Sequence, residues 1–203
     1  MTSVPSVEPH REPAGQVSYT FNPSLMGSPY AFRLAHDALY WQIGRHEGRI
    51  PYRAIRRIRL GFRPVSMQSH RFIAEIWSDD TPKLSISSVS RRGLLELERQ
   101  DAAYTAFVGT LHQRLVAAGA APILQAGSSP WLYWPGLVLL AALALSLPVM
   151  VFRAAQSGAG IGAAIVAVVL VVFLWQLALF FWRNRPGTYR ADALPTTVLP
   201  RRR

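Results

Sequence analysis

The sequence contains no cysteine and a single lysine, and acidic residues are scarce, with 11 Asp and Glu against 22 Lys and Arg in 203 residues. The absence of cysteine excludes a disulfide scaffold, a thiolate zinc site and a cysteine nucleophile. The five histidines, at positions 10, 36, 46, 70 and 112, form no His-Glu-x-x-His pair, so we expect no metal and no cofactor. No Gly-x-Ser-x-Gly motif surrounds the serines at 85–90, and we expect no catalytic residue and no enzymatic activity.

Two long stretches near the C-terminus lack charge altogether. Residues 131–152 and 154–182 hold no charged side chain and no histidine over 22 and 29 residues. Because a helix of about 20 residues crosses a hydrocarbon core of roughly 30 Å, each stretch is long enough to span a bilayer. We therefore expect transmembrane helices at 131–152 and 161–182, joined by a short extracytoplasmic loop at 153–160.

The charges beside these spans predict their orientation. Arg183 and Arg185 follow the second span directly, whereas the loop between the spans holds only Arg153. Since Arg and Lys flanks favour the cytoplasmic side, both termini of this two-pass protein are expected in the cytoplasm. The abundance of arginine and alanine is typical of a high-GC bacterial genome, which favours a bacterial inner (plasma) membrane. The residues expected to anchor the helix ends at the membrane interface are Trp131, Tyr133, Trp134, Trp182, Arg183 and Arg185.

Small residues recur at the start of the second span. Gly158 and Gly162, then Ala163 and Ala167, have the small-x-x-x-small spacing that lets helices approach closely. They are candidates for helix packing, either within the hairpin or between two copies of the chain. The spans contain too few polar groups to line a transport path, which indicates an anchor.

The region before the spans has alternating apolar residues typical of half-buried strands. Residues 1–16 lack the apolar stretch of a signal peptide and are expected to be disordered. From 17 to 121 we expect one cytoplasmic domain, because a period of two recurs along the chain. The expected strands are 17–21, 30–35, 39–43, 55–62, 72–77 and 83–89, with a turn at Arg45–Arg49.

After the strands the period changes to that of a helix. Tyr104, Val108, Leu111 and Leu115 follow at steps of four, three and four, which predicts an amphipathic helix from Asp101 to Ala118 with Asp101 as its cap. Because a lone helix of this length is marginal, its apolar face is expected to pack on the strands. Residues 122–130 are expected to be a linker and 183–203 a basic, disordered cytoplasmic tail.

This pattern resembles a known family. Antiparallel strands closed by one C-terminal amphipathic helix, with Leu39-Tyr40-Trp41, Gly48, Ile50-Pro51-Tyr52, Ile55 and Ile58, are similar to bacterial pleckstrin-homology-like (PH-like) domains attached to transmembrane hairpins. The resemblance covers roughly residues 17–118. It implies an α+β domain of six to seven strands and a binding or assembly module at a membrane without catalytic residues. The family fold has seven strands where the sequence predicts six, so either the early strand is split or one strand is missed.

Seven arginines cluster within nineteen residues of the strand-rich region: Arg45, Arg49, Arg53, Arg56, Arg57, Arg59 and Arg63. Arginine presents a planar fork of donors suited to phosphate and carboxylate. Three interpretations remain open: a solvated strand face, contact with anionic lipid headgroups, or an acidic partner. Nucleic acid is disfavoured because only Tyr52 and Phe62 accompany the arginines as stacking aromatics.

The sequence thus predicts a membrane-anchored binding or scaffolding module. Its expected partners are the lipid bilayer itself, anionic headgroups, and either an unidentified protein or a second copy of the chain. The alternative is an accessory or regulatory subunit of a larger membrane transport or envelope complex.

Overall fold

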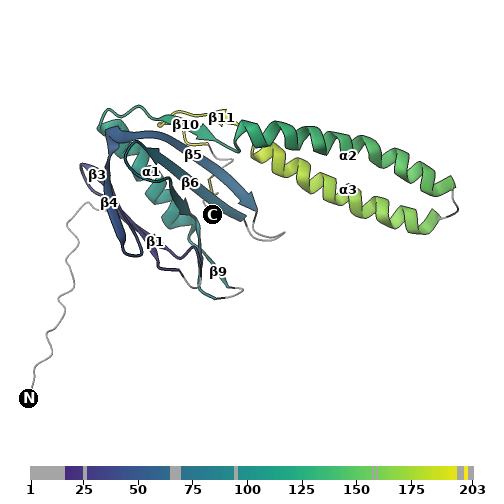
Figure 1. Ribbon diagram of the computed structural model, residues 1–203, viewed down its shortest axis with the longest axis horizontal. Coiled ribbons are helices and arrows are strands. Elements are labelled where there is room, and N and C mark those ends of the chain that lie inside the picture. The colour runs from purple at the N-terminus through teal and green to yellow at the C-terminus, as the bar shows by residue number, and fades with distance from the viewer. Residues whose placement is uncertain are drawn as a thin grey trace, which may run out of the picture.

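The computed structural model describes residues 17–24, 27–64, 70–93, 96–156, 158, 160–195 and 199–200. The chain forms a β-rich domain from which two long helices extend side by side as a hairpin (Figure 1). This is a mixed α+β fold with several antiparallel sheets. Residues 1–16, expected to be disordered, lie outside the described residues.

The first sheet contains four antiparallel strands in chain order: β1 (Val17–Phe21), β2 (Tyr30–Leu34), β3 (Ala38–Ile43) and β4 (His46–Pro51). Alternate residues such as Phe32 and Leu34 are buried, which confirms the period-two pattern. The turn expected over Arg45–Arg49 is wrong. Gly44 and Arg45 alone connect the strands, since Ile43 already pairs with His46. Gly44 has a φ of 62°, which a tight two-residue hairpin requires at its first position.

The second sheet has the strand order β11-β10-β5-β6-β7 and follows a short 3-10 turn, η1 (Tyr52–Ala54). Its strands are β5 (Ile55–Pro64), β6 (His70–Ser78), β7 (Leu84–Ser87), β10 (Ile123–Ala126) and β11 (Gly187–Thr188). Ile58, Leu60 and Phe62 of β5 are buried, and the alternate arginines point to the opposite face, as expected. A small ribbon of β8 (Val89–Arg91) and β9 (Leu97–Arg99) completes the domain.

One helix, α1 (Asp101–Ala117), fills the space between the two sheets. Its buried residues Tyr104, Phe107, Val108, Leu111 and Leu115 confirm the predicted amphipathic face. Tyr19 of β1 meets this face, with its ring centroid 5.6 Å from that of Phe107. The helix ends before Gly119, which has a φ of 64°.

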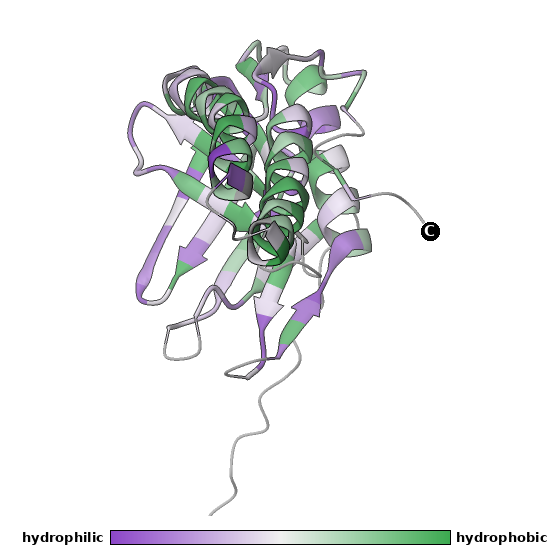
Figure 2. Cartoon of the chain, turned by 90° about the vertical axis from the view of Figure 1, so that its right-hand side faces the viewer, coloured by the Kyte–Doolittle hydropathy of each residue, from purple (hydrophilic) through white to green (hydrophobic). Residues whose placement is uncertain are grey.

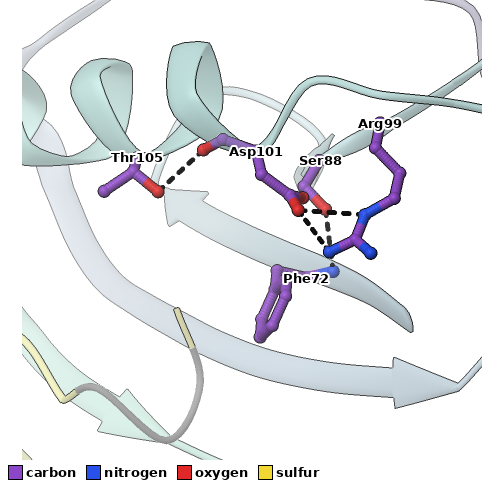
Figure 3. A network of polar contacts seen from close by, with 5 residues as sticks. All are labelled: Phe72, Ser88, Arg99, Asp101 and Thr105. Carbon is purple, nitrogen blue, oxygen red and sulfur yellow. Dashed lines mark hydrogen bonds and ion pairs between the residues drawn. The ribbon is translucent and has the colours of Figure 1, made fainter. Parts of the chain in front are cut away.

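The start of α1 differs from the expectation. The residue in the capping position is Gln100, which makes no side-chain cap, and Asp101 lies inside the first turn. Figure 3 shows the reason: the Asp101 carboxylate is paired with Arg99, while the Thr105 hydroxyl donates to the Asp101 carbonyl at 2.8 Å. The aspartate therefore acts as a salt-bridge partner. Nearby, Ser88 accepts the Phe72 N–H at 3.0 Å, which joins this corner to β6.

The stretches expected to be linker and tail belong to the domain. Within 122–130, β10 pairs in parallel with β5, with Leu124 opposite Ile58. Within 183–203, β11 pairs with β10, and Leu199 is buried in the core. The physical reason is that β5 would otherwise present an unpaired sheet edge, which β10 covers. Residues 196–198 and 201–203 of the tail lie outside the described part of the chain.

The hairpin consists of α2 (Pro130–Gln156) and α3 (Gly160–Arg183), both long and apolar enough to cross a membrane. They cover the two spans predicted at 131–152 and 161–182, and the connection is shorter than the 153–160 predicted. Figure 2 shows that both helices are largely hydrophobic, coloured green. Many of their large apolar side chains are exposed. A helix from the core of a soluble protein would bury such side chains.

The hairpin is joined to the domain through Asn184, which follows α3 and is 1% exposed. Its side-chain oxygen accepts the N–H of Phe62 at 3.2 Å, and its carbonyl accepts the N–H of Ser128 at 2.9 Å. Gly127, with a φ of 82°, packs so closely against the backbone of residues 184–185 that a Cβ would clash there. Both ends of the hairpin are thus fixed against β5.

Replacing Asn184 by leucine should destabilise this junction. The substitution preserves the approximate size but leaves the buried Phe62 N–H without its acceptor, at a cost of about 1–3 kcal/mol. We expect the full-length Asn184→Leu variant in mild detergent to melt at a lower temperature than the unsubstituted protein. Circular dichroism measures both melting temperatures. Arg185→Ala, at the adjacent exposed position, is the control and should melt like the unsubstituted protein. If Asn184→Leu melts at the same temperature as the unsubstituted protein, Asn184 does not stabilise the junction.

The tail is also held by a buried histidine on α1. His112 donates from Nδ1 to the Val108 carbonyl at 2.8 Å, and its Nε2 lies 2.9 Å from the Tyr189 hydroxyl. With Nδ1 as the donor, a neutral ring accepts the Tyr189 proton at Nε2. Burial lowers the pKa of His112, while the bond to Val108 opposes this shift. The folded chain therefore favours the neutral imidazole.

This histidine should make stability depend on pH. The unfolded chain takes up a proton near the ordinary pKa of 6.5, whereas the folded chain does so at a lower pH. The contribution of His112 is thus complete above about pH 6.5 and decreases as the pH falls toward the lowered value. We expect melting temperatures measured from pH 8 to 5 to fall less steeply for His112→Gln than for the unsubstituted chain. The exposed control His46→Gln should retain the original slope.

Candidate functional site

The structure divides the seven predicted arginines into two groups. The first group has four members. Arg45 lies in the β3–β4 turn, at the end of the domain away from the hairpin. The other three have partners nearby: Arg49 lies 3.8 Å from Asp37, Arg53 donates to the Ala118 carbonyl at 2.9 Å, and Arg56 lies 2.7 Å from Asp79. The other three, Arg57, Arg59 and Arg63, share the outer face of β5. A single continuous arginine face is therefore not formed.

The outer face of β5 continues onto its neighbours. Arg71 of β6 stands directly opposite Arg63, and residues opposite each other in a ladder share one side of the sheet. We call Arg57, Arg59, Arg63, Arg71 and Lys83 the basic face. Glu75 is the acidic residue that the described structure places among them, 8% exposed and 3.0 Å from Lys83 and 3.6 Å from Arg63.

Trp77 organises one half of the basic face. The guanidinium carbons of Arg57 and Arg59 lie 5.8 and 5.3 Å from its ring centroid, and the Lys83 ammonium lies at 5.7 Å. Arg59 also donates to the Gln125 side chain at 2.9 Å. Cations near an aromatic face gain electrostatic attraction without losing their charge. Trp77 thus holds three cations in a fixed array.

The basic face ends in a cavity at the base of the hairpin. The cavity has a volume of about 460 Å³ and is lined by Arg59, Arg63, Glu75, Leu132, Phe180 and Asn184, among others. Strand β5 ends and the antiparallel strand β6 begins at the side of the domain nearer the helices (Figure 1). Arg183 lies over the Phe62 ring at 4.2 Å. The end of α3 therefore contacts β5.

The predicted anchor residues surround the same end of the hairpin. Trp131 is 88% exposed, and Trp134, Trp182 and Arg185 are exposed as well. Tyr133 differs, because it is buried against Phe181 with a centroid separation of 5.5 Å. Tyr133 thus packs the hairpin together instead of facing outward, and Arg183 contacts the domain.

Two of the small-residue candidates, Gly158 and Gly162, do not lie at a close contact between α2 and α3. Gly158 lies in the connection with a φ of 81°, and a Cβ at Gly158 or Gly162 would meet nothing within 4 Å among the described residues. The close approach is instead at Gly136 of α2, where a Cβ would lie 2.7 Å from the Phe181 ring. The side chain of Ala163 lies outside the described residues. Gly162 and Ala167 remain candidates for packing between two copies of the chain.

Sequence reasoning missed several members of this site. Arg71 lies outside the predicted arginine cluster, and the sequence places Trp77 only in a strand and Gln125 only in a linker. The alternation in β6 could have placed Arg71 and Trp77 on the face of β5, but β10 gave no such signal. Among the residues that the structure describes, no three His, Asp or Glu side chains lie close enough together to hold a metal ion.

No protein-family model, curated protein or solved structure matches the chain.

The contact at Gly136 predicts unequal effects of two glycine substitutions. Gly136→Leu should force α2 away from Phe181 and destabilise the hairpin by about 1–3 kcal/mol. We expect a lower melting temperature in detergent for this variant. Gly162→Leu, where the space is open, is the matched control and should leave the melting temperature unchanged. If Gly162 packs between copies, the control will instead change the oligomeric mass measured by light scattering.

Proposed function

We propose that this protein is a non-catalytic binding module anchored in a bacterial inner membrane. In this proposal α2 and α3 cross the bilayer, both termini lie in the cytoplasm, and the β domain is PH-like. The basic face contacts anionic lipid at the cytoplasmic surface. Two sheets closed by α1 support the PH-like assignment, and the exposed apolar side chains of the hairpin support insertion.

The observation that carries the proposal is the fixed junction between domain and hairpin. Because Asn184 and β10 attach both helix ends to β5, the domain cannot swing freely on a linker. Arg59 and Arg63 line the cavity at the helix base, the end of the hairpin that also carries the exposed tryptophans Trp131 and Trp182. Tryptophans of this kind prefer the headgroup level of a membrane.

The charges at the two ends of the hairpin support the orientation. Arg183 and Arg185 lie at the end beside the domain, and Arg153 lies at the opposite end of α2. A basic side chain near an anionic membrane surface contributes about 1 kcal/mol, and salt screens this attraction over a Debye length of about 10 Å at 0.1 M. The basic face gives the domain end the larger positive charge.

Lipid selectivity of the full chain tests the proposal. The protein is reconstituted in phosphatidylcholine bilayers, and electron paramagnetic resonance measures how strongly spin-labelled phosphatidylglycerol is immobilised relative to spin-labelled phosphatidylcholine. We expect a preference for the anionic lipid that decreases in 1 M salt. The double variant Arg59→Glu/Arg63→Glu should lose most of this preference, because it reverses the charge beside the helix base.

The matched control is Arg45→Glu/Arg49→Glu, which changes the net charge equally at the β3–β4 turn and on β4, away from the hairpin. The control should retain the preference. An equal loss in both variants would show that only total charge matters and would contradict a role for the basic face. If neither variant changes the preference, the accessory-subunit alternative becomes the better explanation.

A further inference from the structure

A second, smaller cavity lies beside the basic face, where β5, β6 and β8 come together. It has a volume of about 230 Å³, and the charged residues that line it are Arg63, Arg71 and Arg91. No acidic residue is among its lining residues; Glu75 lies at 3.6 Å from Arg63 on the side of the other cavity. Three arginines from three strands therefore line one partly open cavity.

Arg71 is the least compensated of the three. Its Nε is buried and has no hydrogen-bond partner in the described structure. Burial lowers the pKa of Arg71, and the positive charges of Arg63 and Arg91 lower it further. A buried ionised donor without a partner is costly, and natural proteins retain such groups mainly where a ligand or a function requires them.

The walls of the cavity suit an anion. Phe21, Ile73 and Leu97 provide apolar surface, which strengthens electrostatic attraction by lowering the local dielectric constant. Ser85 and Ser87 also line the space. A single water molecule requires roughly 10–15 Å³, and the cavity is many times larger. A tetrahedral oxyanion therefore fits inside it.

We propose that Arg63, Arg71 and Arg91 bind the phosphate group of a phosphorylated ligand, and that this phosphate is the missing partner of Arg71 Nε. An arginine guanidinium can donate two parallel hydrogen bonds to two phosphate oxygens. Several arginines that converge on one point bind a multiply charged phosphate more tightly than they bind a singly charged carboxylate. The site gives the proposed binding module a ligand class. This inference rests on the proposed function in one respect, namely that the chain acts by binding.

Two sources could supply such a phosphate. A small phosphomonoester could enter from solution, or a lipid phosphate could reach the cavity, because Arg63 also lines the cavity at the base of the hairpin. The chemistry at the arginines is the same in both cases. The source is therefore a result of the experiment.

The test uses the full chain, first in a neutral detergent micelle without lipid. Glycerol 3-phosphate is titrated by calorimetry, and its effect on the melting temperature is compared with that of potassium chloride at equal ionic strength. Then the chain is placed in phosphatidylcholine nanodiscs with and without phosphatidic acid, and the melting temperature is measured again. Binding of glycerol 3-phosphate identifies a soluble ligand; stabilisation by phosphatidic acid alone identifies a lipid headgroup. Either result supports the site if it requires Arg71.

Arg71→Met keeps an unbranched apolar stem of similar length but removes the guanidinium group and its charge. We expect at least tenfold weaker binding, together with an unchanged or higher melting temperature without ligand, because an uncompensated charge has been removed. Arg45→Met makes the same substitution at the exposed β3–β4 turn and should bind like the unsubstituted chain. If Arg71→Met fails to fold, Arg91→Met replaces it with the same expectation for binding.

The proposal is overturned if neither probe stabilises the chain beyond the effect of chloride, or if both arginine variants bind normally. The micelle measurement contains no anionic lipid and does not depend on Arg59. If no binding is found in the micelle, the lipid selectivity of the basic face can still be correct. If the lipid selectivity is not found, binding of phosphate in the micelle can still be correct.

Discussion

The pairing of β5 is the constraint on which the remaining structure depends. This strand bonds to β6 along one edge and to β10 along the other, and Asn184 accepts the N–H of Phe62. A buried backbone group without a partner would cost about 1–3 kcal/mol, so the segments on both sides of the hairpin return to the same strand. That return fixes which face of the sheet lies beside the helices, and hence where its arginines can act.

Much of the fold was readable from local sequence patterns. Strands β1 to β3 and β5 to β7 and the helix α1 follow local hydrophobic patterns, and the hairpin has the length and composition of two spans. Strand β4 is the exception, because the sequence predicts a turn over Arg45–Arg49 there. β10 and β11 were not predicted, because they are short and flanked by Gly127 and Pro186, as in a linker. Their structure depends on β5, which lies more than sixty residues earlier in the chain. No local window contains that information.

The candidate site was predictable only in part for a related reason. The arginine run was found because its members are neighbours in sequence, but the partners that neutralise them are distant. Asp79 pairs with Arg56, and the Ala118 carbonyl accepts from Arg53, so these two arginines are used within the domain. Arg71 and Arg91 join Arg63 only through the register of the strands.

The distribution of acidic residues supports a role for the charges that remain. A surface selected only for solubility mixes both signs, because like charges on one face repel each other. Asp37 and Asp79 compensate arginines on the far side of the domain, whereas Glu75 is the one acidic residue that the described structure places among the five cations of the basic face. Trp77 then keeps Arg57 and Arg59 ordered without neutralising them. The uncompensated charge is thus concentrated where the hairpin meets the domain, and an anion from outside the chain is the partner that would restore the balance.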